Sequence, residues 1–171
     1  MPPINPYKKI LSQFNKNKVN YLVIGVSAIN YYSQDPGTMF STQDCDFLVK
    51  PNPKNLVHAL KVLYREGYKL ESNGEQLGPI DLWLASKIIE HGAMITARKG
   101  KSLNIDIVTN GGNISYKEWE QGRKTFKVGN LKVWVGNLPQ LIQAKENSGR
   151  EKDKKFLALY KIQLKEMLKK N

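Results

Sequence analysis

The sequence has little of what several protein classes require. It contains a single cysteine, Cys45, in 171 residues, which excludes a disulfide within the chain. No uninterrupted apolar run approaches the roughly 20 residues that cross a bilayer, because charged residues or glycines interrupt every stretch. The N-terminus also lacks a basic segment followed by an apolar block, the pattern of a secretory leader. These absences predict a cytoplasmic protein without membrane association.

Acidic residues are scarce as well, with 15 Asp and Glu against 27 Lys and Arg, and the formal net charge is +12. Such a balance favours phosphate-bearing partners such as nucleotides or RNA, although surface lysines also serve solubility. The two histidines lack the spacing of a zinc site. The length suits one compact domain and is short for two. We therefore expect residues 1–171 to form a single domain, with a core over 19–135 and C-terminal helices over 137–170.

The apolar patterns predict helices and strands in mixed order. Helical spacing predicts helices at 6–17, 53–67, 137–149 and 150–170, and runs of β-branched and aromatic residues predict strands at 19–25 and 44–49. Two antiparallel hairpins are expected, from 93–97 with 103–109 and from 126–128 with 131–135. The middle is less regular, with a turn at 72–74 and a strand running into a short helix at 80–89. This order predicts an α+β fold, a mixed β-sheet with flanking helices and a C-terminal helical segment.

Two acidic residues interrupt the predicted strand at 44–49. Residues two apart on a strand project from the same face, so Asp44 and Asp46 point one way while Cys45 and Phe47 point into the core. At roughly 6–7 Å and an effective dielectric near 20, the two charges would repel by about 2–3 kcal/mol. A divalent cation would relieve this repulsion, because Mg²⁺ binds carboxylate oxygens, water and substrate phosphate. The alternative is a wet strand end, where both aspartates are solvated or paired with lysine.

A third acid, Asp106, interrupts the apolar strand predicted at 103–109. Charged residues are seldom fully buried unless they are paired or bind a metal. If this strand lies beside the strand at 44–49, three carboxylates share one face, which is enough for two Mg²⁺ ions. Asp81 is the competing third ligand, but the strand pattern around Asp106 is cleaner on both sides.

The turn at Gly25 supplies a complementary feature. A strand that turns at glycine into a helix leaves backbone N–H groups free to bind phosphate. We expect Ser27 to cap that helix and to add a hydroxyl donor. A lone Gly-x-Ser is a weak signal, and the carboxylate pair that follows it strengthens the interpretation.

Together these residues resemble the nucleotidyltransferase superfamily of DNA polymerase β, in particular the small bacterial branch with AbiEii-type toxins and minimal nucleotidyltransferases. The matching positions are Gly25-Val26-Ser27-Ala28, Thr42-x-Asp44-x-Asp46 and Asp106. A C-terminal motif of this branch is matched at Leu141, Ile142, Lys145, Gly149, Arg150, Lys152 and Asp153. The likeness spans residues 19–160, with the middle excepted.

The resemblance implies in-line attack of an acceptor hydroxyl on the α-phosphorus of a nucleoside triphosphate, with release of pyrophosphate. It implies that Asp44, Asp46 and Asp106 are catalytic and ligate Mg²⁺ or Mn²⁺. The implied nucleotide- and phosphate-binding residues are Gly25, Val26, Ser27, Thr42, Lys145 and Arg150, and Asp153 would orient one of the two cations. The alternative for Lys145 and Arg150 is an ordinary solvated helix face.

Two positions depart from the family pattern. Val26 replaces a small residue and would crowd a triphosphate, and Phe40 stands where many relatives have arginine. The leading hypothesis is an Mg²⁺-dependent transferase that uses ATP or another nucleotide and modifies RNA, tRNA, protein or a small molecule. It includes a role in defence or as a toxin with an antitoxin protein. The alternatives are a catalytically weakened nucleotide- or RNA-binding module of the same fold, and a basic RNA-binding domain without a nucleotide site.

Overall fold

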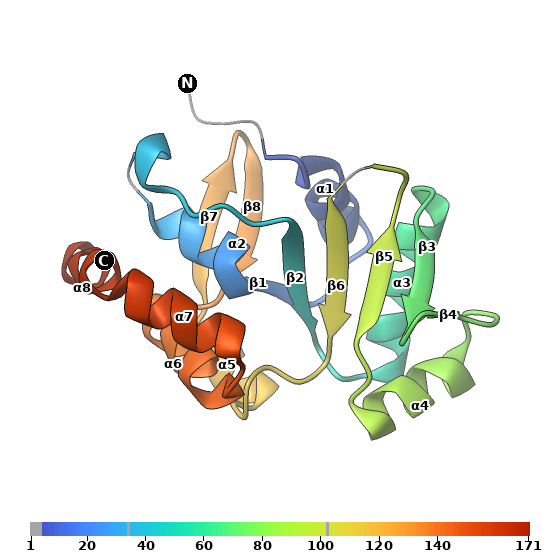
Figure 1. The fold of residues 1–171 in the computed structure, drawn as a ribbon. Helices are drawn as coiled ribbons and strands as arrows, with labels where there is room; N and C mark the ends of the chain where they lie inside the picture. Colours follow the sequence, from blue (N-terminus) through green and yellow to red (C-terminus); the bar gives the residue numbers. More distant parts are fainter. Residues whose placement is uncertain (1–4, 34, 102) are drawn as a thin grey trace.

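A mixed eight-stranded sheet forms the centre of the computed structural model, which describes residues 5–33, 35–101 and 103–171 (Figure 1). Its strands are β1 (Tyr21–Ile24), β2 (Asp44–Val49), β3 (Lys69–Ser72), β4 (Glu75–Gln76), β5 (Ile95–Arg98), β6 (Asn104–Val108), β7 (Lys124–Val128) and β8 (Leu131–Val135). They lie in the order β4-β3-β5-β6-β2-β1-β8-β7. The pairs β2–β6 and β1–β8 are parallel and the other neighbours are antiparallel. The predicted mixed sheet and both predicted hairpins, β5–β6 and β7–β8, are confirmed.

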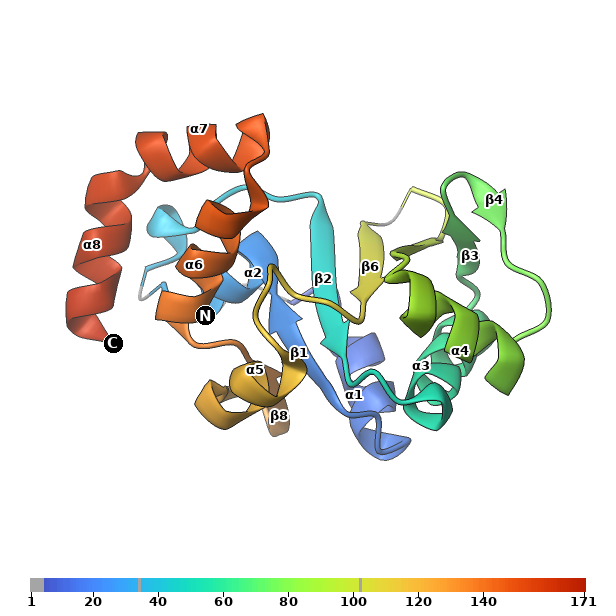
Figure 2. The ribbon, with the colours of Figure 1, turned by 90° about the horizontal axis from the view of Figure 1, so that it is seen from below.

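The helices cover the two faces of the sheet unequally. They are α1 (Lys8–Lys16), α2 (Gly25–Ile29), α3 (Pro53–Arg65), α4 (Leu82–His91), α5 (Tyr116–Gly122), α6 (Leu138–Ser148), α7 (Glu151–Leu159) and α8 (Lys161–Lys170), with 3₁₀ turns at Asn30–Tyr32 and Pro36–Thr38. Figure 2 shows α1 and α3 on one side of the sheet and α2, α6 and α7 on the other. On this second side, no helix of the described residues crosses β6, β5 or β3 (Figure 1). The part of this face over β6, β5 and β3 is thus left without a covering helix in the described part of the chain.

The hydrophobic core explains why the acids of β2 lie on the open side. Cys45, Phe47 and Val49 are buried toward α1 and α3, so the alternation of the strand turns Asp44 and Asp46 to the opposite face. The ring of Phe14 in α1 meets that of Phe47 edge to face, with centroids 5.1 Å apart. Burying one such side chain stabilises the fold by about 1.5–3 kcal/mol. The core therefore fixes the register that presents the carboxylates.

The middle of the chain differs from its prediction. Residues 80–89 do not begin as a strand, because Asp81 is the N-cap of α4 and accepts a hydrogen bond from the backbone N–H of Leu84 at 2.8 Å. The predicted turn at 72–74 is present, but it joins β3 and β4, two short strands that the pattern does not reveal. Helix α5 was also missed, although Ser115 and Glu118 form a capping box at its start.

The C-terminal segment forms two helices, not the single helix expected at 150–170. The chain leaves helical geometry at Tyr160, and α7 and α8 run in different directions (Figure 2). Phe40 packs into this bend, because its ring contacts those of Tyr160 and Phe156 at centroid distances of 4.6 and 5.0 Å. An apolar residue at every fourth position, the pattern of residues 150–170, does not reveal such a bend. Across the described ranges, no helix is both long enough and apolar enough to cross a membrane.

Candidate active site

The open sheet face brings two of the predicted carboxylates side by side. Parallel pairing of β2 with β6 places Asp46 opposite Asp106 and Asp44 opposite Asn104. Neighbouring strands are about 4.8 Å apart, and residues paired in a parallel ladder project from the same face. Asp106 is therefore the third carboxylate on the sheet face that carries Asp44 and Asp46. Asp81 lies outside it, as the cap of α4.

The electrostatics of this face are unfavourable for its own charges. Burial raises the pKa of Asp46, and the nearby negative charges of Asp106 and Asp44 raise it further. Burial also raises the pKa of Asp106, and the charge of Asp44 adds to this, although a hydrogen bond from the Thr96 hydroxyl acts in the opposite direction. The carboxylates thus lack full compensation from the surrounding protein.

Gly25 forms the turn between β1 and α2 directly against Asp46. Its φ of +76° lies in the left-handed region, which glycine adopts without the steric cost of a side chain. A Cβ at this position would collide with the carboxylate of Asp46. The absence of a side chain therefore lets the strand-to-helix turn and the carboxylate occupy adjacent space.

The other residues of the turn and of the following loop are held locally. The expectation that Ser27 caps α2 is wrong; the N-cap is Ile24, and Ser27 lies within the first turn because the helix already begins at Gly25. Its hydroxyl lies 3.4 Å from the Ile24 carbonyl oxygen. Val26 is half-buried and packs against the core. Thr42 lies just before β2, with its hydroxyl 3.4 Å from the backbone nitrogen of Asp44.

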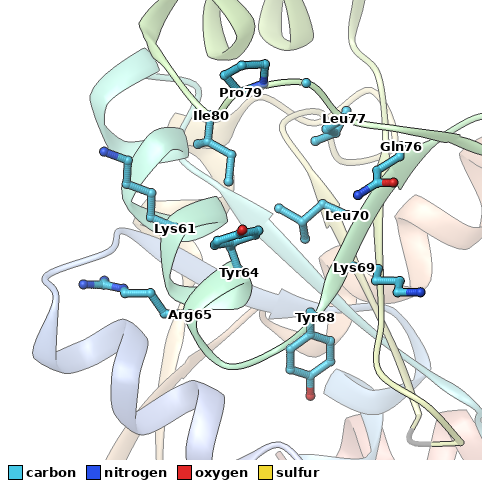
Figure 3. Close-up of a pocket in the computed structure, with 11 residues that line it drawn as sticks. Lys61, Tyr64, Arg65, Tyr68, Lys69, Leu70, Gln76, Leu77, Pro79 and Ile80 are labelled. Atoms are coloured by element: carbon cyan, nitrogen blue, oxygen red, sulfur yellow. The ribbon is translucent and has the colours of Figure 1, made fainter.

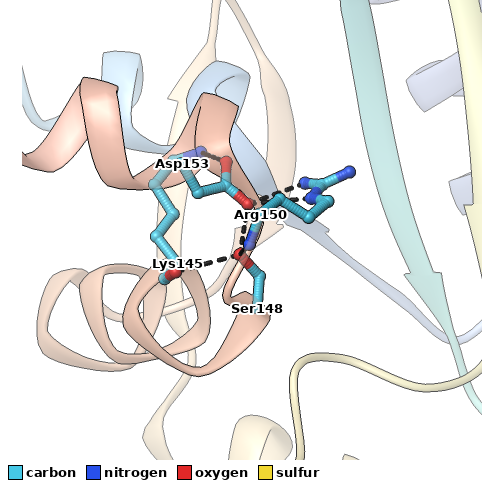
Figure 4. Close-up of polar contacts among 4 residues, drawn as sticks. All are labelled: Lys145, Ser148, Arg150 and Asp153. Carbon is cyan, nitrogen blue, oxygen red and sulfur yellow. Dashed lines mark hydrogen bonds and ion pairs between the residues drawn. The ribbon is translucent and has the colours of Figure 1, made fainter.

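A second polar cluster, formed by Lys145, Ser148, Arg150 and Asp153, joins the end of α6 to the start of α7 (Figure 4). Asp153 is almost fully buried and accepts hydrogen bonds from Lys145 Nζ at 3.0 Å, Ser148 Oγ at 2.5 Å and Arg150 Nε at 3.0 Å. Burial raises the pKa of Asp153, but these donors and the charge of Lys145 outweigh that effect and lower it. We call this set the Asp153 cluster.

The Asp153 cluster is linked to the carboxylate face through Lys145. Its side chain is 11% exposed, with Nζ 4.7 Å from the centroid of the Phe156 ring. Helix α6 packs against α2, and the positive charge of Lys145 lowers the pKa of Asp46. Arg150 differs, because its side chain is 70% exposed. The structure therefore brings Lys145 toward the carboxylates and leaves Arg150 at the surface.

The strand beside β6 contributes two residues that the sequence analysis missed. Thr96 is paired with Asp106 and donates a hydrogen bond from its hydroxyl to Asp106 Oδ1 at 3.0 Å. Arg98 lies two residues later, hence on the same face, where its Nε donates to Glu71 Oε1 at 2.6 Å. Polar and apolar residues alternate in β5, which indicates which of its residues share a face. This pattern identifies Thr96 and Arg98 as site residues only when the pairing register of β5 with β6 is also known.

Comparison with known proteins includes a distant likeness in fold. The sequence matches no known protein-family model, and no curated protein sequence is significantly similar to it. The chain is similar to the crystal structure of an antigenic nucleotidyltransferase-like protein from Paracoccidioides brasiliensis, with a TM-score of 0.47 and 14% sequence identity. The alignment covers 86% of this chain and 68% of that one. A likeness this weak assigns no function, so the interpretation of the site depends on its own residues.

The donor set of the open face fits a divalent cation that a substrate helps to hold. Within residues 5–33, 35–101 and 103–171, no three His, Cys, Asp or Glu side chains gather into a metal centre by themselves. Asp46 and Asp106 nevertheless form an adjacent oxygen pair with raised pKa values, which is the charge imbalance that a cation corrects. Mg²⁺ is usually bound through one or two carboxylates, with water and substrate phosphates as its other ligands. Two adjacent carboxylates and a third on the same strand satisfy that requirement.

Proposed function

We propose that this protein is a nucleotidyltransferase that moves a nucleoside monophosphate from a nucleoside triphosphate to an acceptor hydroxyl, with Mg²⁺ or Mn²⁺ as cofactor. The observation that carries the proposal is the in-register pairing of Asp46 with Asp106 on an open sheet face, directly against the Gly25 turn. Perturbed carboxylates that share an accessible face are typical of catalytic sites. The motif resemblance and the basic net charge of +12 agree with a phosphate-bearing substrate.

Each residue of the proposed site has a separate role in the reaction. Asp46 and Asp106, with Asp44 on the same strand, would hold the divalent cation, which would neutralise phosphate charge and activate the attacking oxygen. Asp106, oriented by Thr96, assists removal of the proton from the acceptor hydroxyl. The Gly25 turn gives the triphosphate a close approach to the backbone beside Asp46. Lys145, held by Asp153, supplies a fixed positive charge near this site.

We consider three classes of molecule as the source of the acceptor hydroxyl. A positively charged chain favours RNA, including tRNA, over protein or a small molecule as the acceptor. A role as a toxin, with an antitoxin protein as partner, is the biological context that the family resemblance suggests. The nucleotide is to be identified by offering the four triphosphates separately.

Label transfer from nucleoside triphosphates to an RNA pool, with Mg²⁺ or Mn²⁺, tests the proposed reaction. We expect Asp46→Asn to reduce the rate at least about a hundredfold, the usual effect of losing one group that stabilises transition-state charge. Asp81→Asn is the matched control, because Asp81 was the competing ligand and asparagine also caps helices well. Transfer that is equally fast in Asp46→Asn would refute the proposal.

A catalytically weakened nucleotide-binding module is the second candidate. One observation favours it: Phe40, which replaces a basic residue of the family pattern, is buried in an aromatic cluster with Phe156 and Tyr160 and offers no charge to a nucleotide. Nucleotide binding that depends on Asp46, without any label transfer, would support this candidate against the enzyme.

A further inference from the structure

A groove lies apart from the carboxylate face, between α3, the β3–β4 hairpin and the segment that leads to α4 (Figure 3). Its volume is about 590 Å³, within the range of sites for small organic ligands. The floor is apolar, with Leu70, Leu77 and Ile80, and the ring of Tyr64 lies across from Leu70 in Figure 3. Leu70 is buried on the side of the sheet that faces α3, so the sheet separates this groove from Asp46.

Tyr64 is an unusual residue for this surface. It is 67% exposed, although α3 buries most of its apolar residues in the core. An exposed, flat ring above an apolar floor offers a stacking surface for a planar aromatic group. Stacking of a nucleic-acid base on such a ring is largely independent of base identity.

Positive charge borders the groove along α3. Lys61 and Arg65, four residues apart on α3, extend to one side in Figure 3, whereas Lys69, which is paired with Arg98, leaves β3 on the face opposite to Leu70. Neither Lys61 nor Arg65 forms an ion pair with a carboxylate of the described residues, whereas Lys9, Arg98 and Lys145 do. Arg65 Nη2 donates a hydrogen bond to the neutral Asn17 Oδ1 at 3.3 Å, which leaves its charge uncompensated. Among the described residues that line the groove there is also no Asp or Glu. The charges are therefore available to an external anion.

We propose that this groove binds single-stranded nucleic acid, with a base stacked on Tyr64 and the flanking phosphates on Lys61 and Arg65. A stacking ring beside two cationic side chains suits a chain that alternates bases with phosphates. An acidic peptide would meet the charges but would not use the exposed ring in the same way. The inference goes beyond the proposed reaction and does not depend on it, because the carboxylates lie on the other face of the sheet.

Fluorescence anisotropy with a labelled oligouridine of about 12 nucleotides tests the proposal, since single-strand sites commonly span about 4–16 nucleotides. Tyr64→Ala is expected to weaken binding at least about fivefold, the lower bound for loss of one stacked base. Trp83→Ala is the matched control, because Trp83 is 69% exposed but does not line the groove. Circular dichroism establishes that each variant is folded.

The double variant Lys61→Ala/Arg65→Ala tests the interaction with the phosphates. It should flatten the dependence of log affinity on log salt by about 0.7 for each phosphate that the protein no longer neutralises. Lys161→Ala/Lys165→Ala, with the same four-residue spacing on the exposed side of α8, should leave the slope unchanged. Asp46→Asn should not weaken oligonucleotide binding, which separates this site from the proposed reaction.

Three results would overturn the proposal. The first is equal affinity of the wild type and Tyr64→Ala for the oligouridine. The second is an equal loss of affinity in the groove variants and their controls. The third is displacement of the oligouridine by polyglutamate as readily as by unlabelled oligouridine, which would show that the groove recognises charge without stacking.

Discussion

Two clusters of charge in this protein shift the pKa of an aspartate in opposite directions. Asp153 accepts hydrogen bonds from a lysine, an arginine and a serine hydroxyl, and its pKa is lowered (Figure 4). Asp46 lies beside two other carboxylates, and its pKa is raised. Both side chains have lost solvent, so the contrast comes from the neighbours that the fold supplies. In the Asp153 cluster the one carboxylate is compensated by two cationic side chains, while the carboxylate face keeps an excess of negative charge.

The difference indicates separate tasks. A compensated cluster fixes geometry, and here it joins α6 to α7 and holds Lys145 in place. An excess of like charge destabilises the folded chain and is typical of a site that binds a counter-charge from outside. Lys145 connects the two, because it is bonded to Asp153 and also lowers the pKa of Asp46. The first cluster thus positions a cation for the second.

Removing the acid of the compensated cluster should have the largest effect on stability. Asp153→Ala leaves Lys145 largely buried without its carboxylate, and loss of one partner of a buried pair costs about 3–5 kcal/mol. Urea unfolding followed by circular dichroism measures this change. Glu151→Ala on the same helix is the control: Glu151 is 79% exposed and 3.7 Å from Lys154, so less than about 0.5 kcal/mol is expected. Equal costs in the two variants would contradict the contrast.

A methyl group at Gly25 should disturb the carboxylate face through sterics. Gly25→Ala forces alanine into a left-handed conformation, which costs about 1–2 kcal/mol, and its Cβ would collide with Asp46. Gly74→Ala imposes a similar conformation, at φ +80°, where no atom lies within 4 Å of the added Cβ. We expect both variants to unfold at lower urea concentration, and only Gly25→Ala to lose label transfer. Loss of transfer in Gly74→Ala would remove the specific role of the Gly25 turn.

Local patterns in the sequence were enough to predict much of the sheet. The bounds of β2 and its division into core-facing and open-facing residues followed from alternation around Asp44 and Asp46. Helix α6 followed from the Asn137 cap and the end at Gly149, both of which are present. These features depend on residues close in sequence, which is the range that periodicity and capping describe.

The errors arose where distant contacts decide the structure. The bend at Tyr160 depends on packing against Phe40, more than a hundred residues earlier in the chain. Prediction of the site depended on distant contacts in the same way. The sequence identified Asp106 as a candidate, but only the register of β2 with β6 places it beside Asp46. Thr96 was missed for this reason, since its contact with Asp106 exists only across strands.

Neutralising one acid of the uncompensated cluster should stabilise the protein. Asp46→Asn removes repulsion with Asp106 and Asp44 and keeps the side-chain shape, so we expect a gain of about 1 kcal/mol at neutral pH in the presence of a chelator. The same variant is predicted to lose transfer. Urea unfolding of Asp46→Asn and of Asp81→Asn, whose stability should not change, provides the comparison. A destabilised Asp46→Asn would show that this carboxylate is compensated by the fold.

Acidification should remove the stability that the charged form of Asp153 contributes, and this loss should be smallest near neutral pH. Because the folded pKa of Asp153 is lower than the unfolded value of about 3.9, its charged form stabilises the folded state at all pH values above that unfolded value. The contribution is lost as pH falls through the folded pKa, hence below about pH 4. The stability advantage of the wild type over Asp153→Asn, measured by urea unfolding at a series of pH values, should therefore be constant from pH 7 to about pH 5 and shrink below about pH 4. An advantage that grows on acidification would mean that burial, rather than Lys145, Ser148 and Arg150, controls this carboxylate.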